Sequence, residues 1–160
     1  MVPEVFHSVC YNNKNVPPSI SSLHTFTPAL LHGYSRRRVR HADYPGITAT
    51  ATPSSVFGTL VTGLTRANMA KLDFFEGNQY ERRRVKVNVL KEVGNIKGEG
   101  NVEGEEVEAE TYVFLEEGDL EDKEWDLEEF RREKLAKWTR AGYVFEECDP
   151  ERPAGVAAAE

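Results

Sequence analysis

Two stretches with alternating apolar and polar residues, separated by a glycine-rich segment, constrain the fold of this 160-residue chain most strongly. In residues 83–89, RRVKVNV, valines alternate with polar side chains, which is typical of a strand with one buried face. A second such stretch runs from about Glu106 to Leu115. Residues 91–105 between them are rich in glycine and charge, so we expect a long irregular loop there. The pattern predicts an antiparallel strand pair.

Two further strands are predicted nearer the N-terminus. Residues 11–28 hold prolines, asparagines and serines, which are typical of a loop. Ala29–Val39 begins with an apolar run and continues into arginines, and we interpret it as one strand. His41–Pro53 is rich in turn residues and is expected to connect it to a strand at Ser55–Leu60.

Two helices are also predicted. Thr65 is placed to cap a short helix that extends to Phe75. Asp126 and Glu129 have the spacing of a capping box, and the apolar residues after them share one helical face as far as Trp138. Strands with short helices predict an α+β domain, antiparallel or mixed, of which a small β-barrel is one form. We assign the domain to residues 1–148 and a flexible C-terminal tail to residues 149–160.

The overall charge argues against several classes of partner. A formal net charge of −7 and a pI of about 5.2 do not suit phosphate neutralisation, so we expect no nucleic-acid partner. The basic run Arg36–Arg40 is interpreted as the solvated face of a strand. No apolar run reaches the length of a membrane span, and the N-terminus lacks the apolar core of a signal peptide. We therefore expect a cytoplasmic protein with no membrane partner, in which Cys10 and Cys148 are free thiols.

Common catalytic and metal-binding motifs are missing from the sequence. The four histidines are not spaced like the ligands of a helical metal site, so we expect no bound metal. There is no G-x-S-x-G, no Walker loop and no G-x-G-x-x-G, which leaves serine hydrolysis and nucleotide binding without support. We expect no cofactor.

The end of the predicted Thr65 helix carries an unusual carboxylate. Glu76 is followed at once by Gly77, which can take the left-handed conformation that ends a helix. The helix dipole disfavours a negative charge there, and burial would raise the pKa of Glu76 further. Such a group could exchange a proton near neutral pH. The alternative is a surface glutamate that forms a salt bridge with a neighbouring arginine, and local sequence leaves both interpretations open.

The surrounding segment resembles a known family. Residues 72–87 fit the pattern L-D-x-F-E-G-x-x-Y-x-R-R-x-V-x-V, the hallmark of gamma-glutamylcyclotransferase-like proteins, in the branch named for avirulence-induced plant genes. The resemblance spans roughly residues 2–138 and is greatest to the fungal members. It extends over these further motifs, in order: L-L-H-G-Y-S-R-R-R-V at 30–39, Y-P-G-I at 44–47, V-F-G-T-L-V-T-G-L-T at 56–65, T-Y-V-F at 111–114 and the helix beginning at Asp126.

The resemblance implies a small β-barrel flanked by short helices and a cyclotransferase activity. Such enzymes convert gamma-glutamyl amines or amino acids, which are small-molecule substrates, to 5-oxoproline and the free amine. The substrate's α-amine attacks its own γ-carbonyl while a glutamate transfers the proton, a role that falls on Glu76. Tyr44 and Tyr80 are candidates to line the substrate pocket, although tyrosines in such folds also serve as ordinary packing residues. No metal or cofactor is needed.

One family motif has no counterpart here. In the family, a Y-G-T-L or Y-G-S-T loop follows the first strand, and its backbone amides hold the substrate and the developing oxyanion. Residues 1–7 resemble the segment immediately after that loop, and Phe57–Leu60, F-G-T-L, is interpreted as part of an ordinary strand. We therefore expect the first strand of the barrel to be missing. The alternative hypothesis is a catalytically inactive relative that acts as a binding or interaction module and pairs as a homodimer through the open sheet edge.

Overall fold

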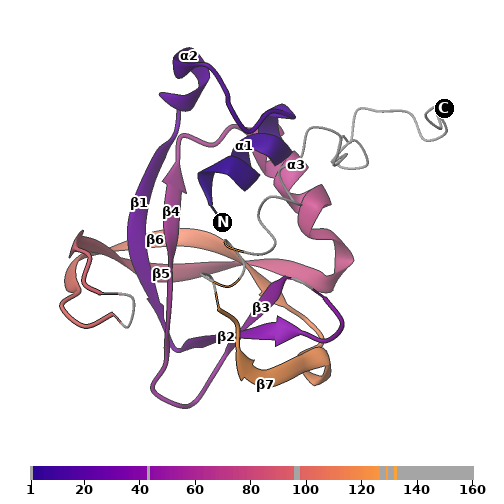
Figure 1. Cartoon of the computed structure of the whole chain (residues 1–160), viewed down its shortest axis with the longest axis vertical. Coiled ribbons are helices and arrows are strands. Elements are labelled where there is room, and N and C mark those ends of the chain that lie inside the picture. The colour runs from indigo at the N-terminus through magenta and orange to yellow at the C-terminus, as the bar shows by residue number, and fades with distance from the viewer. Residues whose placement is uncertain (1, 43, 96–97, 127–128, 130–131, 133–160) are drawn as a thin grey trace, which may run out of the picture.

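The chain folds into two antiparallel sheets with a few short helices, an α+β arrangement as predicted (Figure 1). The computed structural model describes residues 2–42, 44–95, 98–126, 129 and 132. Most of the predicted helix after Asp126 and the tail at 149–160 lie outside the described residues. No helix among the described residues is long and apolar enough to span a lipid bilayer.

The larger sheet contains the strand pair that the alternating pattern predicts. Its order is β4-β1-β5-β6, with bounds Ser55–Thr62, Thr25–His32, Tyr80–Glu92 and Val102–Phe114. β5 and β6 pair antiparallel, with Val85 opposite Ala109, so this prediction is confirmed. The irregular segment between them is shorter than expected, because the strands continue to Glu92 and resume at Val102. Gly104 permits this, since a Cβ there would lie 2.9 Å from the Val89 carbonyl oxygen.

The smaller sheet has the order β3-β2-β7, with bounds Pro45–Ala49, Tyr34–Val39 and Leu120–Glu124. The single strand predicted at Ala29–Val39 is wrong: the chain turns at Gly33, whose φ of +75° favours glycine, and β1 and β2 enter different sheets. The predicted connection His41–Pro53 contains β3. Its Gly46 is buried, and a Cβ there would lie 2.8 Å from Phe114 of β6, so the two sheets approach closely at this glycine.

The expected barrel is not formed. The two sheets are separate in the described part of the chain, and β4 and β6 are the edge strands of the larger one. The sheets are joined by packing instead of a continuous ladder, through a buried cluster of Val39, Phe114 and Leu120. Side-chain packing, and not backbone hydrogen bonding between strands, therefore holds the two sheets together at this cluster.

The helices α1, α2 and α3, with bounds Pro3–Tyr11, Pro18–Ser21 and Arg66–Glu76, lie near one end of the larger sheet (Figure 1). Two short 3-10 helices, η1 at Gly77–Gln79 and η2 at Glu117–Asp119, directly precede β5 and β7. α1 was not predicted; its Phe6 is 1% exposed and packs in a cluster with Leu72 of α3. α2 lies within the predicted loop. The predicted cap of α3 is confirmed, because Asn68 N donates to Thr65 Oγ1 at 3.1 Å and Thr65 N donates to Asn68 Oδ1 at 3.0 Å.

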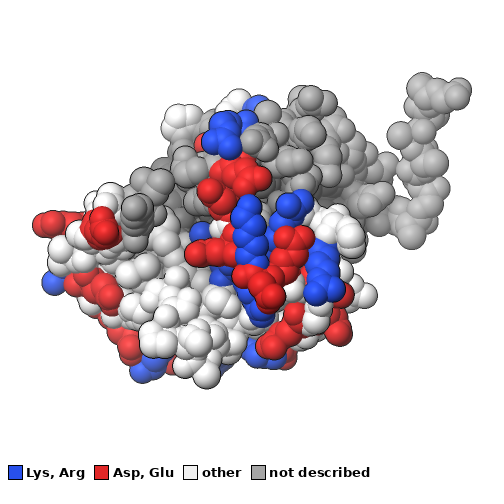
Figure 2. All heavy atoms as spheres, turned by 60° about the horizontal axis from the view of Figure 1, so that its bottom comes forward, with Lys and Arg blue, Asp and Glu red and all other residues white. Residues whose placement is uncertain are grey.

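The arginine run on β2 is less exposed than a solvated strand face would be. Arg40 is exposed, but Arg36 is half-buried and lies over the Trp125 ring, 5.2 Å from the ring centroid. Burial lowers the pKa of Arg36. Arg37 contacts Asp122 of β7 at 4.0 Å. Figure 2 shows basic and acidic side chains interleaved on this face, and the run therefore contributes to pairing between strands as well as to surface charge.

Candidate functional site

Glu76 is the last residue of α3, as predicted. The helix begins at the Thr65–Asn68 capping box and ends where Gly77 takes a φ of +70°. Glu76 is therefore at the negative end of the helix dipole, where a negative charge is disfavoured. The capping box and Gly77 together set the ends of α3 and so place Glu76 at the C-terminus of the helix.

The surroundings of Glu76 favour the protonated carboxyl group. Burial raises the pKa of Glu76 to about 7 from an ordinary 4.5. Among the described residues, none forms a hydrogen bond or ion pair with this carboxylate. The nearby arginines have other partners: Arg82 lies 3.5 Å from Asp73, and Arg83 lies 2.8 Å from Glu81. In the described part of the chain, Glu76 is therefore not the salt-bridged surface glutamate of the alternative interpretation.

Tyr44 and Tyr80 lie in the same region. The Tyr80 hydroxyl donates a hydrogen bond to the Pro45 carbonyl oxygen at 2.9 Å, and the Tyr44 hydroxyl donates to Gln79 Oε1 at 3.1 Å. Burial is the main cause that raises the pKa of Tyr80. Electrostatic interactions with Glu76 and, to a smaller extent, with Tyr44 raise it further, so the three groups are neighbours. The hydroxyl of Tyr80 is therefore a neutral hydrogen-bond donor at physiological pH.

The sequence analysis missed a polar network near Glu76 that includes Tyr112, Asp73 and Arg82. The Tyr112 hydroxyl donates to Asp73 Oδ1 at 2.7 Å, and Asp73 lies one helical turn before Glu76. Burial raises the pKa of Tyr112, and Asp73 and Glu76 add to this effect. Arg82 joins the network at 3.2 Å from Glu110. Tyr112 was inside the T-Y-V-F motif without an assigned role, because strand alternation alone does not show what a hydroxyl contacts.

This arrangement is suited to proton transfer. A carboxyl group with a pKa near 7 is populated in both protonation states at neutral pH, so it can accept a proton and later return it. The Tyr80 and Tyr112 hydroxyls remain protonated; each donates its proton within the protein, and each oxygen can accept a hydrogen bond from a polar ligand. Within the described residues, no group of three or more histidine, cysteine or acidic side chains is arranged to hold a metal ion.

A protein family model matches most of the described chain, including the residues around Glu76. The family model described as gamma-glutamyl cyclotransferase, AIG2-like, matches residues 8–132, which include the whole segment around Glu76. The chain belongs to this family. Curated relatives of the gamma-glutamyl cyclotransferase, AIG2-like family include Protein AIG2 C and Protein AIG2 B of Arabidopsis thaliana. They are 35% and 34% identical over 65% and 74% of this chain.

The chain spans only part of those relatives, since the matches cover 56% and 63% of their length. Solved structures support the same family fold. The solution structure At3g28950.1 from Arabidopsis thaliana has a TM-score of 0.51 and 25% identity, and the match covers 98% of this chain and 93% of that one. The solution structure of At5g39720.1 from the same plant has a TM-score of 0.52 and 25% identity, covering 86% and 78%. The mixed α+β architecture of this chain is therefore shared with both solved structures.

Proposed function

We propose that this protein is a gamma-glutamylcyclotransferase that converts gamma-glutamyl amines or amino acids to 5-oxoproline and the free amine, with Glu76 as its acid–base group. The observation that carries the proposal is a carboxyl group at the end of α3 whose pKa is about 7, within a chain of the gamma-glutamyl cyclotransferase, AIG2-like family. We place the reaction in the cytoplasm. It needs no metal or cofactor, because the substrate supplies its own nucleophile.

The reaction requires a proton to be moved twice. The substrate's α-amine nitrogen attacks its γ-carbonyl carbon, a carbon–nitrogen bond forms, and Glu76 accepts the proton that the amine loses. Collapse of the tetrahedral intermediate breaks the original amide bond, and Glu76 returns the proton to the leaving amine. A group with a pKa near the working pH serves both steps, whereas an exposed glutamate would be a poor acid.

The tyrosines have a binding role in this proposal. Tyr80 and Tyr44 lie beside Glu76, and their hydroxyls are held by Pro45 and Gln79. In this position their rings would line the space next to the carboxyl group, and their hydroxyls would orient the polar end of the substrate. Tyr80→Phe would keep the ring contact with Phe114, at 5.1 Å between centroids, while removing the hydroxyl.

The F-G-T-L sequence is not a source of donors for the developing oxyanion in this proposal. The F-G-T-L sequence at Phe57–Leu60 lies within β4, paired with β1, as the sequence analysis predicted. Its backbone groups therefore belong to a strand and do not form a substrate-binding loop. We accordingly propose to assay two forms, the 160-residue chain and a chain extended ahead of Met1 with a strand that ends in Y-G-T-L.

The test measures 5-oxoproline released from gamma-glutamyl amines and amino acids. Glu76→Gln has nearly the same size but cannot accept a proton at neutral pH, so we expect activity to fall roughly 100-fold or more. Glu81→Gln changes a more exposed glutamate on β5 and is the matched control, with activity close to the parent. Thermal denaturation verifies that each variant is folded.

Two outcomes would contradict the proposal. Full activity in folded Glu76→Gln would remove Glu76 from the mechanism. If neither folded parent form released 5-oxoproline from any gamma-glutamyl compound, the cyclotransferase assignment would be wrong, and a binding or interaction module would be the better explanation.

A further inference from the structure

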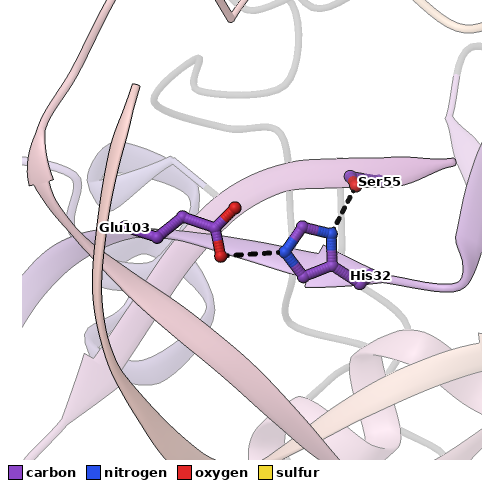
Figure 3. A network of polar contacts seen from close by, with 3 residues as sticks. All are labelled: His32, Ser55 and Glu103. Atoms are coloured by element: carbon purple, nitrogen blue, oxygen red, sulfur yellow. Dashed lines mark hydrogen bonds and ion pairs between the residues drawn. The ribbon is translucent and has the colours of Figure 1, made fainter. Parts of the chain in front are cut away.

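A second network of chemically active groups lies outside the Glu76 site. His32 Nδ1 is 2.6 Å from Ser55 Oγ, and His32 Nε2 is 3.0 Å from Glu103 Oε2 (Figure 3). The three residues come from the end of β1, the start of β4 and the start of β6. None of them has a part in the reaction proposed above, and they share no residue with that site.

Strand pairing places His32 and Ser55 against each other. They are directly opposite in the antiparallel β1–β4 ladder, and the adjacent Gly33 N–H donates to the Ser54 carbonyl at 2.9 Å. That bond marks the neighbouring pair as hydrogen-bonded, so His32 and Ser55 form the pair in which side chains approach most closely. The contact is therefore fixed by backbone register and not by a flexible loop alone.

Glu103 is on β6, the edge strand opposite β4 in the larger sheet, and its side chain contacts His32. It lies opposite Leu90, where the β5–β6 ladder shifts register, and such irregularities bend strands. As a result β6 brings its second residue to the far nitrogen of His32. In the neutral tautomer that has its proton on Nε2, the carboxylate accepts that N–H, and the unprotonated Nδ1 is directed at the serine hydroxyl.

This is the connectivity of an activated nucleophile: a hydroxyl, a base within hydrogen-bond distance, and a third group that orients the base. The geometry points to Ser55 as a nucleophile that accepts an acyl group from an activated carboxylic ester. Ser55 Oγ forms a bond to the acyl carbon, the bond between that carbon and the leaving oxygen breaks, and the serine proton passes to His32 Nδ1. Glu103 stabilises the imidazolium that results, and the proton then passes to the departing alcohol or to water.

The exposure of the network sets its expected reactivity. The side chains of His32 and Glu103 are 50% and 39% exposed, and Ser55 is exposed as well, so a small ester can reach the serine hydroxyl directly. Water around the site weakens electrostatic stabilisation of the transition state. We therefore expect one acyl group per chain to accumulate on Ser55, with slow turnover, and not the rate of an enclosed hydrolase.

The experiment uses p-nitrophenyl acetate and the full chain. The parent should show a burst of nitrophenolate equivalent to one site per chain, and peptide mass spectrometry should locate a single acetyl group on Ser55. Ser54→Ala, one residue away, is the matched control and should behave like the parent.

Three variants separate the roles. Ser55→Ala should abolish the burst and the acetylated peptide. His32→Gln can still hydrogen-bond to both neighbours but cannot take up the proton, so labelling should slow by roughly 100-fold. Glu103→Gln keeps the shape without the charge and should slow labelling less than His32→Gln does. Near-ultraviolet circular dichroism verifies the fold of each.

The proposal would be overturned by acetylation spread over lysines and several serines, by an unchanged burst in Ser55→Ala, or by an unchanged labelling rate in folded His32→Gln. Each of these results is independent of the cyclotransferase assay, because Glu76 remains intact in every variant used here.

Discussion

Replacing Glu76 with glutamine should stabilise the protein above neutral pH and have little effect in acid. The folded state holds the pKa of Glu76 at about 7, against 4.5 ordinarily. The folded state therefore binds more protons than the unfolded state between these values, and the free energy of unfolding falls as pH rises through this window. Glutamine resembles the protonated carboxyl group and does not ionise, so the free energy of unfolding of the variant does not fall in this way as the pH rises.

The difference of pKa sets the magnitude. At 1.36 kcal/mol for each pKa unit, ionising Glu76 destabilises the fold by at most about 3 kcal/mol once the pH exceeds 7. Glu76→Gln should therefore match the parent at about pH 4.5 and exceed it by up to that amount at about pH 8. For a chain of this size the gain corresponds to roughly 6–12 °C in melting temperature.

The assay is urea or thermal denaturation of parent and variant across this pH range, with the difference between the two curves as the result. Glu105→Gln on β6 replaces an exposed glutamate and should give a curve parallel to the parent. A stability difference that does not change with pH, or one that grows toward acid, would show that the carboxyl group is not destabilised by burial. Loss of activity in the same variant would then need another explanation.

Three further predictions concern the fold. Gly46→Ala should cost about 1–3 kcal/mol, because its Cβ would lie 2.8 Å from Phe114, while Gly58→Ala, with open space around it, should cost less than about 1 kcal/mol; urea denaturation compares the two. Thr65→Ala should cost about 1 kcal/mol by removing the cap of α3, which the same measurement checks. Burial raises the pKa of Cys10 to about 11, so in a variant whose other cysteine is serine, thiol reagents should react much faster with unfolded than with native protein near pH 8.

Features set by local chemistry were predictable from the sequence. The β5–β6 pair follows from side-chain alternation, the cap of α3 from Thr65, and the position of Glu76 from the glycine next to it. The sequence analysis named the helix end and burial as two causes of a raised pKa at Glu76. Burial is the main cause in the structure, and its extent depends on neighbours distant in the sequence, which local pattern does not show. That Tyr112 reaches Asp73 was hidden for the same reason.

Other features were not predictable because tertiary packing overrides the local pattern. The run Ala29–Val39 has no break in its strand-forming residues except Gly33, and one glycine does not reveal which sheet each half joins. α1 begins with a proline, and the polar residue His7 is one of its buried positions. The sequence therefore lacks the continuous apolar face that would predict a helix there. A closed barrel was expected from resemblance, but the order of strands is decided by long-range pairs such as Arg37 with Glu124.

The two sheets should differ in when they form during folding. β5 and β6 are joined by a short segment, so their ladder closes a small loop at little entropic cost. The smaller sheet is assembled from residues 34–49 and 120–124, and its β2–β7 pair cannot form until the intervening chain has been brought back. We expect amide protons of β5 and β6 to become protected first in pulse-labelled refolding and those of β7 last. The turn at Gly33, which joins β1 to β2, would then act as the hinge about which the smaller sheet packs onto the larger one.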